Sequence, residues 1–92
     1  MIRLIFYRLI YIETGKMSRM KIKPRPLLLK FGKKVRKFRL ERELSQEKLA
    51  DKAGLHWTYI SGIERGLRNI SLKNILKLAK ALGIKPKNLL EF

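Results

Sequence analysis

Small and polar side chains that could recognise a nucleic acid are gathered in one short stretch of this sequence. Trp57, Thr58, Ser61, Gly62 and Arg65 recur at spacings of three and four residues, which places them on one face of a helix. Hydroxyl and guanidinium groups on such a face can hydrogen-bond to base edges when the helix enters the major groove of DNA. The short side chains permit close approach, and Gly62 removes bulk.

Groups for catalysis are scarce. The chain has no cysteine and one histidine, His56, which excludes thiolate metal sites and pairs of catalytic histidines. The seven acidic residues are scattered among bases, and no glycine-rich phosphate loop is present. We therefore reject an enzyme and expect no cofactor, no metal site and no small-molecule ligand. His56 is expected at the surface, in the corner before the helix, with a phosphate contact as the alternative.

The charge balance is strongly basic. Lys and Arg number 23 against 7 Asp and Glu, which gives a net charge of +16. The electrostatic field of so basic a protein attracts polyanions. Duplex DNA, RNA and an anionic membrane surface are all possible partners of this kind. Four lysines at helical spacing are expected to form a solvated face, part of which lies near phosphate: Lys30, Lys33, Lys34 and Lys37. The absence of cysteine is compatible with a reducing cytoplasm, where we expect the protein to work.

The chain divides near Pro24 and Pro26 into a basic and apolar N-terminal extension, residues 1–26, and a compact helical domain, residues 27–92. The apolar run 1–12 is shorter than the ~20 residues that span a bilayer, and it lacks the layout of a signal peptide. Three interpretations remain open for it: packing on the domain or a partner, contact with a membrane surface, or an upstream extension with Met17 or Met20 as the true start. We favour the last, so that residues 1–19 would not belong to the native product.

From residue 28 onward the apolar spacing is helical, and no strand signal follows residue 26. Leu28, Phe31, Val35 and Phe38 define one face of a first helix. The later helices are marked by serine N-caps, a first-turn proline and terminal glycines. We expect an all-α, compact five-helix domain whose later helices span 46–53, 57–65, 72–82 and 86–90, with caps at Ser45 and Ser71 and stops at Gly54, Gly66 and Gly83.

Apolar residues divide into a core set and a surplus. Leu49, Leu55, Ile60 and Ile63 are expected to lie behind the 57–65 helix, and the fourth helix is expected to line the core with Leu72, Ile75, Leu78, Ala79 and Leu82. A domain of this size does not need four further apolar residues, and exposed apolar patches mark interfaces. We expect a symmetric homodimer through the last two helices, formed by Leu76, Ile84, Leu90 and Phe92.

The segment SQEKLADKAGLHWTYISGIERG, residues 45–66, resembles the Cro/C1-type helix-turn-helix family, also called the XRE family. The resemblance covers Phe31 to about Leu90, and six residues fall at family spacing: Gln46, Ala50, Gly54, Ile60, Glu64 and Gly66. The run TYISGIERGLRNIS, residues 58–71, is similar to the controller proteins of restriction-modification systems. The resemblance implies the compact fold of lambda-repressor-like domains and binding to double-stranded DNA.

The resemblance also implies roles for individual residues. Gln46 matches a position that touches a backbone phosphate, and Thr58, Tyr59 and Ser61 match positions that contact bases or phosphates. Two further pairs match family positions: a loop that meets DNA beside the third helix, Arg68 and Asn69, and an internal ion pair, Arg39 and Glu64. Trp57 departs from the family, where controller proteins tend to have Arg and phage repressors Gln.

Each of these residues also has a purely structural interpretation. Gln46 can be a good helix former, Thr58 and Ser61 solvated surface, and Tyr59 an edge of the core. Trp57 can lie flat against Leu55 and the domain, and it can also pack on a thymine methyl or a sugar. Asn69 can simply shape its loop, because Asn tolerates turn conformations.

We therefore expect a sequence-specific transcriptional regulator that binds a near-palindromic operator as a dimer, with reading helices about 34–36 Å apart. It would act as an activator or a repressor according to its position relative to a promoter. Three alternatives remain: an antitoxin or partner-binding module of the same fold, a membrane-surface protein, and a nonspecific RNA-binding protein.

Overall fold

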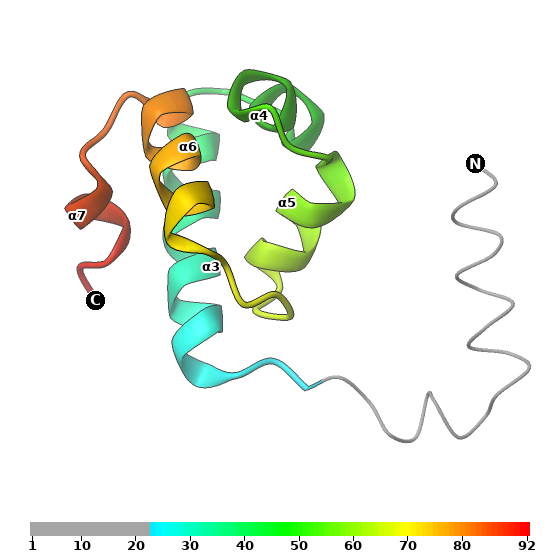
Figure 1. The fold of residues 1–92 in the computed structure, drawn as a ribbon, viewed down its shortest axis with the longest axis vertical. Coiled ribbons are helices and arrows are strands. Elements are labelled where there is room, and N and C mark those ends of the chain that lie inside the picture. Colours follow the sequence, from blue (N-terminus) through cyan, green and yellow to red (C-terminus); the bar gives the residue numbers. More distant parts are fainter. Residues whose placement is uncertain (1–22) are drawn as a thin grey trace, which may run out of the picture.

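The computed structural model of the protein describes residues 23–92. Residues 1–22 lie outside the described part, so the expectations for most of the extension, including a start at Met17 or Met20, stay predictions. The described chain consists of α3 (Pro26–Glu41), α4 (Gln46–Ala53), α5 (Trp57–Glu64), α6 (Leu72–Leu82) and α7 (Pro86–Leu89), shown in Figure 1. The all-α, five-helix prediction is confirmed, and no strand occurs within residues 23–92.

Two of the helices have the bounds that the sequence predicted, because their caps act as expected. The hydroxyls of Ser45 and Ser71 each accept a hydrogen bond from a backbone N–H three residues further on, at 3.0 and 3.2 Å, at the starts of α4 and α6. Both helices end at a glycine in the left-handed region, Gly54 with φ 69° and Gly83 with φ 68°.

The first helix begins earlier than predicted. α3 starts at Pro26, so the expected boundary after residue 26 falls inside the helix. Proline suits a first helical position, because its φ is already helical and no N–H is needed there. α5 and α7 each end one residue before the predicted end. No helix within residues 23–92 has the length and apolar character needed to cross a bilayer.

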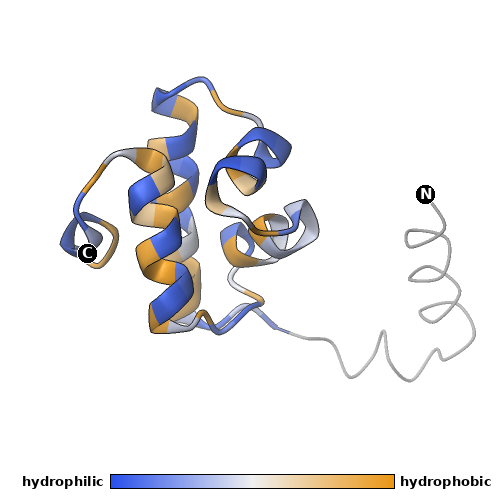
Figure 2. Cartoon of the chain, turned by 45° about the horizontal axis from the view of Figure 1, so that its top comes forward, coloured by the Kyte–Doolittle hydropathy of each residue, from blue (hydrophilic) through white to orange (hydrophobic). Residues whose placement is uncertain are grey.

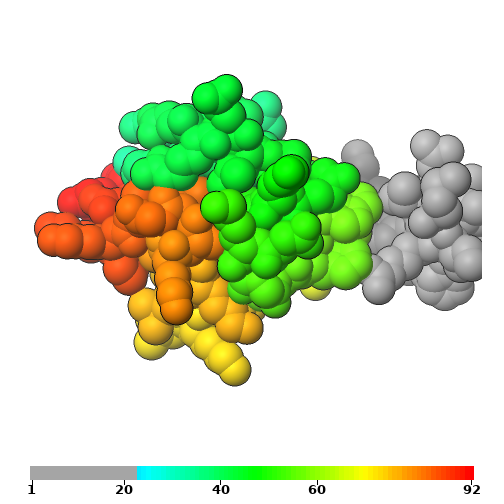
Figure 3. All heavy atoms as spheres, turned by 90° about the horizontal axis from the view of Figure 1, so that it is seen from above, coloured from blue at the N-terminus to red at the C-terminus, as the bar shows by residue number. Residues whose placement is uncertain are grey.

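The long helix α3 is the element around which the others are arranged. It contacts α5, α6 and α7, while α4 bridges α5 and α6. α7 lies on the opposite side of the α3 and α6 pair from α5, as Figure 1 shows and as Figure 3 shows from the end where α4 lies. One side of the molecule is therefore formed by α4 and α5, and α7 closes the other.

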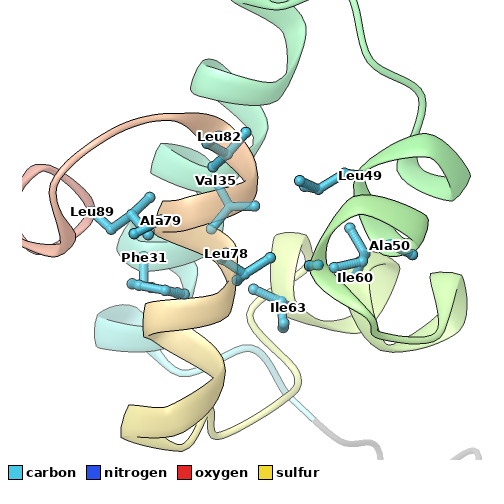
Figure 4. Packing of buried hydrophobic residues seen from close by; sticks show 11 residues of the cluster. Phe31, Val35, Leu49, Ala50, Ile60, Ile63, Leu78, Ala79, Leu82 and Leu89 are labelled. Carbon is cyan, nitrogen blue, oxygen red and sulfur yellow. The ribbon is translucent and has the colours of Figure 1, made fainter.

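The core collects one apolar side from each helix. Val35, Leu49, Ile60 and Leu78 are all 0% exposed, and Figure 4 shows their side chains converging from α3, α4, α5 and α6. Apolar and polar segments alternate along α6 in Figure 2, as expected of a helix with one buried side. The other buried apolar residues are Phe31, Ala50, Ala53, Ile63, Ala79, Leu82 and Leu89.

The prediction that Leu72 lines the core was wrong, since its side chain is 72% exposed. The first turn of α6 meets α5 through Asn74, whose side-chain amide donates to the Tyr59 hydroxyl. Two residues of α-helix correspond to a rotation of about 200°, so Leu72 points away from the face that Asn74 presents. Three further residues expected on core-facing sides are only half-buried: Leu28, Leu55 and Ile75. Leu55 and Ile75 nevertheless pack against the core.

Candidate nucleic-acid interface

The candidate interface is built on α5, which a tight corner and a buried inner side hold in place. Gly54 reaches φ 69°, and a Cβ atom there would meet nothing within 4 Å, so glycine is needed for its conformation rather than for space. The N–H of Leu55 donates to the carbonyl of Ala50 at 2.9 Å and closes the corner. Ile60 and Ile63, at 0% and 1% exposure, anchor the inner side of α5.

The backbone of α3 lies in direct contact with α5 and with the turn that follows α5, at two glycines, a feature that the sequence analysis missed. A Cβ atom on Gly32 would come within 2.2 Å of the carbonyl oxygen of Ile63. A Cβ atom on Gly66, which has φ 73°, would lie 2.9 Å from the Cα of Leu29. Because any side chain would force α3 away from α5 or from the turn after it, glycine at these two positions fixes the depth at which α5 sits.

A buried ion pair joins α3 to α5, and a third helix is tied to it. The Arg39 guanidinium donates from Nε to Glu64 Oε2 at 2.6 Å and from Nη2 to Oε1 at 3.0 Å, and both residues are 7% exposed. Arg39 Nη1 also donates to the carbonyl of Leu44 at 2.7 Å, in the corner before α4. The pair that the resemblance implied is therefore present, and it fixes α5 against α3.

Gln46 takes part in the same network. Its side-chain amide donates from Nε2 to Glu64 Oε1 at 3.1 Å, and the residue is half-buried at the first position of α4. The resemblance implied a phosphate contact for this residue and did not include a bond to Glu64. An amide nitrogen carries two hydrogens, so one remains to serve a ligand at the surface.

The outer side of α5 carries the residues that the sequence singled out. Trp57 is 37% exposed at the first helical position, Thr58 and Ser61 are half-buried, and Arg65 is exposed directly after the helix. The Nε of Arg65 donates to the carbonyl of Ser61 at 3.3 Å, which lays its side chain back along α5. These four residues follow one side of the helix, as the spacing predicted.

Gly62 does not belong to that exposed surface, contrary to the prediction. It is buried, because the side chain of Arg68 lies across it, and a Cβ atom at Gly62 would come within 2.7 Å of Arg68 Cγ. The Arg68 guanidinium lies over the ring of Tyr59 at 5.8 Å from the ring centre. The missing side chain therefore makes room for Arg68 rather than for a ligand.

Tyr59 is half-buried, between the core and the surface. Its hydroxyl accepts a hydrogen bond from Asn74 Nδ2 at 3.0 Å, while Arg68 covers its ring. Asn69 is exposed in the loop that follows. The cations Arg65 and Arg68 thus flank α5, and the one acidic side chain of this helix, Glu64, is buried against Arg39.

His56 has a role that the sequence analysis missed, although its position could have indicated it. It precedes α5 as Ser45 precedes α4, and it is the N-cap: Nδ1 accepts from the backbone N–H of Thr58 at 3.2 Å. The same Nδ1 lies 2.7 Å from Thr58 Oγ1. Its ring stacks on that of Trp57, with 6.2 Å between centres and 27° between planes. The interpretation in which Trp57 lies flat against Leu55 and the domain stays a prediction.

The residues assigned to a dimer interface are not equally available. Leu76, Leu90 and Phe92 are 50%, 49% and 53% exposed, whereas Ile84 is half-buried and packs against the core. Leu72 adds a further exposed apolar side chain one turn before Leu76 on α6. The exposed members of the assigned set therefore lie on α6 and beyond α7, while two further exposed leucines, Leu27 and Leu40, lie on α3.

Comparison with known proteins gives consistent matches over this part of the chain. A family model described as helix-turn-helix matches residues 35–89. The chain is 62% identical over 65 residues to the control protein C.BamHI of Bacillus amyloliquefaciens, and this match covers 70% of the chain and 80% of that protein.

Solved structures resemble the fold at moderate to high identity. The restriction-modification controller protein C.AhdI from Aeromonas hydrophila superimposes with a TM-score of 0.67 and 55% identity, over 67% of this chain and 94% of that one. The biofilm regulator SinR of Bacillus subtilis, solved in complex with DNA, superimposes with a TM-score of 0.64 and 34% identity, over 66% of this chain and 98% of that one.

Proposed function

Because this chain belongs to the helix-turn-helix family, we propose that it is a sequence-specific, DNA-binding regulator of transcription that inserts α5 into the major groove. Membership confirms the Cro/C1-type resemblance seen in the sequence, and this family is not a class of enzymes. The observation that carries the proposal is the division of α5 into two sides. Ile60 and Ile63 are buried, while the side with Trp57 and Arg65 is exposed and cationic.

Phosphate contacts supply affinity and register in this proposal. Arg65 and Arg68 flank α5, and Asn69 lies in the adjoining loop. The Tyr59 hydroxyl accepts from Asn74, so its own proton is available for a phosphate oxygen. Gln46 adds the second hydrogen of its amide at the N-terminus of α4, where the helix dipole favours anions. These contacts are insensitive to sequence.

Base contacts come from the outer side of α5. Thr58 and Ser61 are the short side chains that can reach base edges, and Trp57 presents an apolar ring to a thymine methyl or a sugar. The Arg39–Glu64 pair and the glycine contacts with α3 keep this side at a fixed depth and angle. Arg39 and Glu64 therefore act on recognition by position and touch no DNA.

The proposed active form is a homodimer on a near-palindromic operator. Leu76, Leu90 and Phe92 are exposed apolar residues on α6 and beyond α7, away from α5. A two-fold axis through this region would direct both copies of α5 to the same side, about 34–36 Å apart for successive major grooves. The half-buried Ile84 would contribute at the edge.

A narrower proposal is that the protein controls a restriction-modification system. Its support is the 62% identity to the control protein C.BamHI and the 55% identity to the controller protein C.AhdI. The same relatives favour a regulator over an antitoxin of the same fold. A transcriptional regulator of this kind would work in the cytoplasm, as expected from the sequence.

Selection of bound duplexes from a random pool tests the proposal. We expect an enriched near-palindrome, and log affinity that falls linearly with log salt by ~0.9 per phosphate contact. Thr58→Ala or Ser61→Ala should change the enriched sequence, whereas Gln46→Ala or Arg68→Ala should weaken all sequences more evenly. A pool with no enriched duplex, or equal binding to RNA of any sequence, overturns the function.

A further inference from the structure

The contact between His56 and Thr58 determines where the hydroxyl proton of Thr58 lies. Nδ1 of His56 is 3.2 Å from the backbone nitrogen of Thr58 and 2.7 Å from its Oγ1. A backbone N–H can only donate, so Nδ1 must be an acceptor and carries no proton. The hydrogen that lies between Nδ1 and Oγ1 therefore belongs to the threonine hydroxyl.

This arrangement leaves Thr58 with acceptor capacity alone. A hydroxyl has one proton and two lone pairs, and here the proton is directed to the imidazole. A phosphate oxygen offers no hydrogen and cannot bind such a group. In the major groove the complementary groups are the exocyclic amines, N6 of adenine and N4 of cytosine.

We propose that His56 is a positioning residue that makes Thr58 a hydrogen-bond acceptor, so that Thr58 selects an adenine or cytosine amino group in the operator. This inference rests on the proposed function, since it needs α5 in the major groove. The inference extends the proposed function because it gives one hydrogen bond a direction: the base donates and Thr58 accepts.

Two contacts hold the imidazole in the orientation that the proposal requires. The ring stacks on that of Trp57 at the start of α5. As the N-cap of α5, His56 also keeps Nδ1 directed at the backbone N–H of Thr58. The helix cap and the Thr58 hydroxyl therefore share one acceptor, Nδ1 of His56.

The tautomer can be measured on the full-length protein without DNA. Nitrogen NMR of labelled histidine at mildly alkaline pH should show Nδ1 as the unprotonated nitrogen and Nε2 as the protonated one. Thr58→Val, which keeps the shape of the side chain and removes the hydroxyl, should shift the Nδ1 resonance. A protonated Nδ1, or a resonance that Thr58→Val leaves unmoved, overturns the inference.

The direction of the base contact can be tested with the selected operator. In synthetic duplexes, each adenine is replaced in turn by purine and each cytosine by pyrimidin-2-one, which lack the exocyclic amine. At one position of the operator, removal of the exocyclic amine should lower the affinity of the wild-type protein about three- to ten-fold, in line with the loss of one hydrogen bond. The Thr58→Val protein should bind the parent and the analogue equally.

The control separates the helix cap from the orientation of the hydroxyl. His56→Ser keeps a side chain that caps helices well, so the thermal unfolding midpoint should stay unchanged. The Thr58 hydroxyl can then both donate and accept, so the preference for an amino base over a base that presents a carbonyl at this position should be lost. If His56→Ser keeps that preference, or if no analogue weakens the wild type, this inference fails while the proposed function stands. If no duplex is enriched at all, the proposed function itself fails.

Discussion

Arg39 and Glu64 lie 25 residues apart in the sequence and form a buried pair with two hydrogen bonds, at 2.6 and 3.0 Å. The pair joins α3 to the end of α5, and Gln46 extends it to α4. Three helices therefore meet at one carboxylate. The position of the outer side of α5 therefore depends on the Glu64 carboxylate, which is buried and out of reach of DNA.

Glu64→Gln should destabilise the fold strongly, because it leaves the Arg39 guanidinium buried without its counter-charge. The expected loss in unfolding free energy is ~3–5 kcal/mol, measured by urea denaturation. Glu41→Gln is the matched control, since Glu41 pairs with Arg42 at 3.7 Å on the surface. That change should cost under about 1 kcal/mol. Equal losses for the two variants would contradict a structural role for the buried pair.

Gly62→Ala should weaken DNA binding without unfolding the domain. The new methyl group would occupy the space 2.7 Å from Arg68 Cγ and push that side chain off α5. Alanine is itself favourable in a helix, so the melting temperature should change little. Affinity should fall for all duplexes, and the slope of log affinity against log salt should lose ~0.9 if Arg68 contacts one phosphate.

The double variant Gly62→Ala/Arg68→Ala shows whether the loss of DNA affinity caused by Gly62→Ala comes from displacement of the Arg68 side chain. In the Arg68→Ala background, Gly62→Ala should have no further effect on affinity, because the displaced side chain is already gone. Fully additive losses would show that the methyl group instead blocks the groove directly, as the sequence analysis had assumed for this position.

Local signals in the sequence predicted the helices well, and contacts between helices account for what it missed. Ser45, Ser71, Gly54 and Gly83 act within one turn of their own position, so the bounds of α4 and α6 could be derived from spacing alone. Gly32 could not be interpreted in this way, because its role depends on the carbonyl of Ile63 in another helix.

The candidate site shows the same division. The side of α5 that carries Trp57, Thr58, Ser61 and Arg65 follows from helical periodicity. The burial of Gly62 under Arg68 depends on the path of a later loop, which periodicity does not encode. The cap formed by His56 was missed because Ser, Thr, Asp and Asn are the usual residues at that position.

Trp57→Arg should shift the selected operator toward guanine at one position. The resemblance places Arg there in controller proteins, and arginine can grip guanine O6 and N7 with two hydrogen bonds where indole offers a single donor. Discrimination against the other bases at that step should rise by ~1–3 kcal/mol, measured by selection and by titration of single-base variants. An unchanged operator would mean that residue 57 lies outside the groove.

Replacing an exposed apolar residue of the proposed interface by a charged residue should dissociate the dimer into monomers. Leu76→Glu and Leu90→Glu each place a carboxylate in a surface that is half-exposed in the single chain, at 50% and 49%, and would be covered in the dimer. Burying an unpaired charge is costly, so sedimentation should show monomers at concentrations where the wild type associates.

Leu40→Glu is the control for that experiment, because Leu40 is 52% exposed on α3 and outside the α6 and α7 surface. It should leave association and operator binding unchanged. Loss of the dimer should also weaken binding to the full operator far more than binding to a half-site, because two linked reading helices gain from a high effective concentration. Wild-type protein that stays monomeric, or equal losses on both duplexes, would rule out this interface.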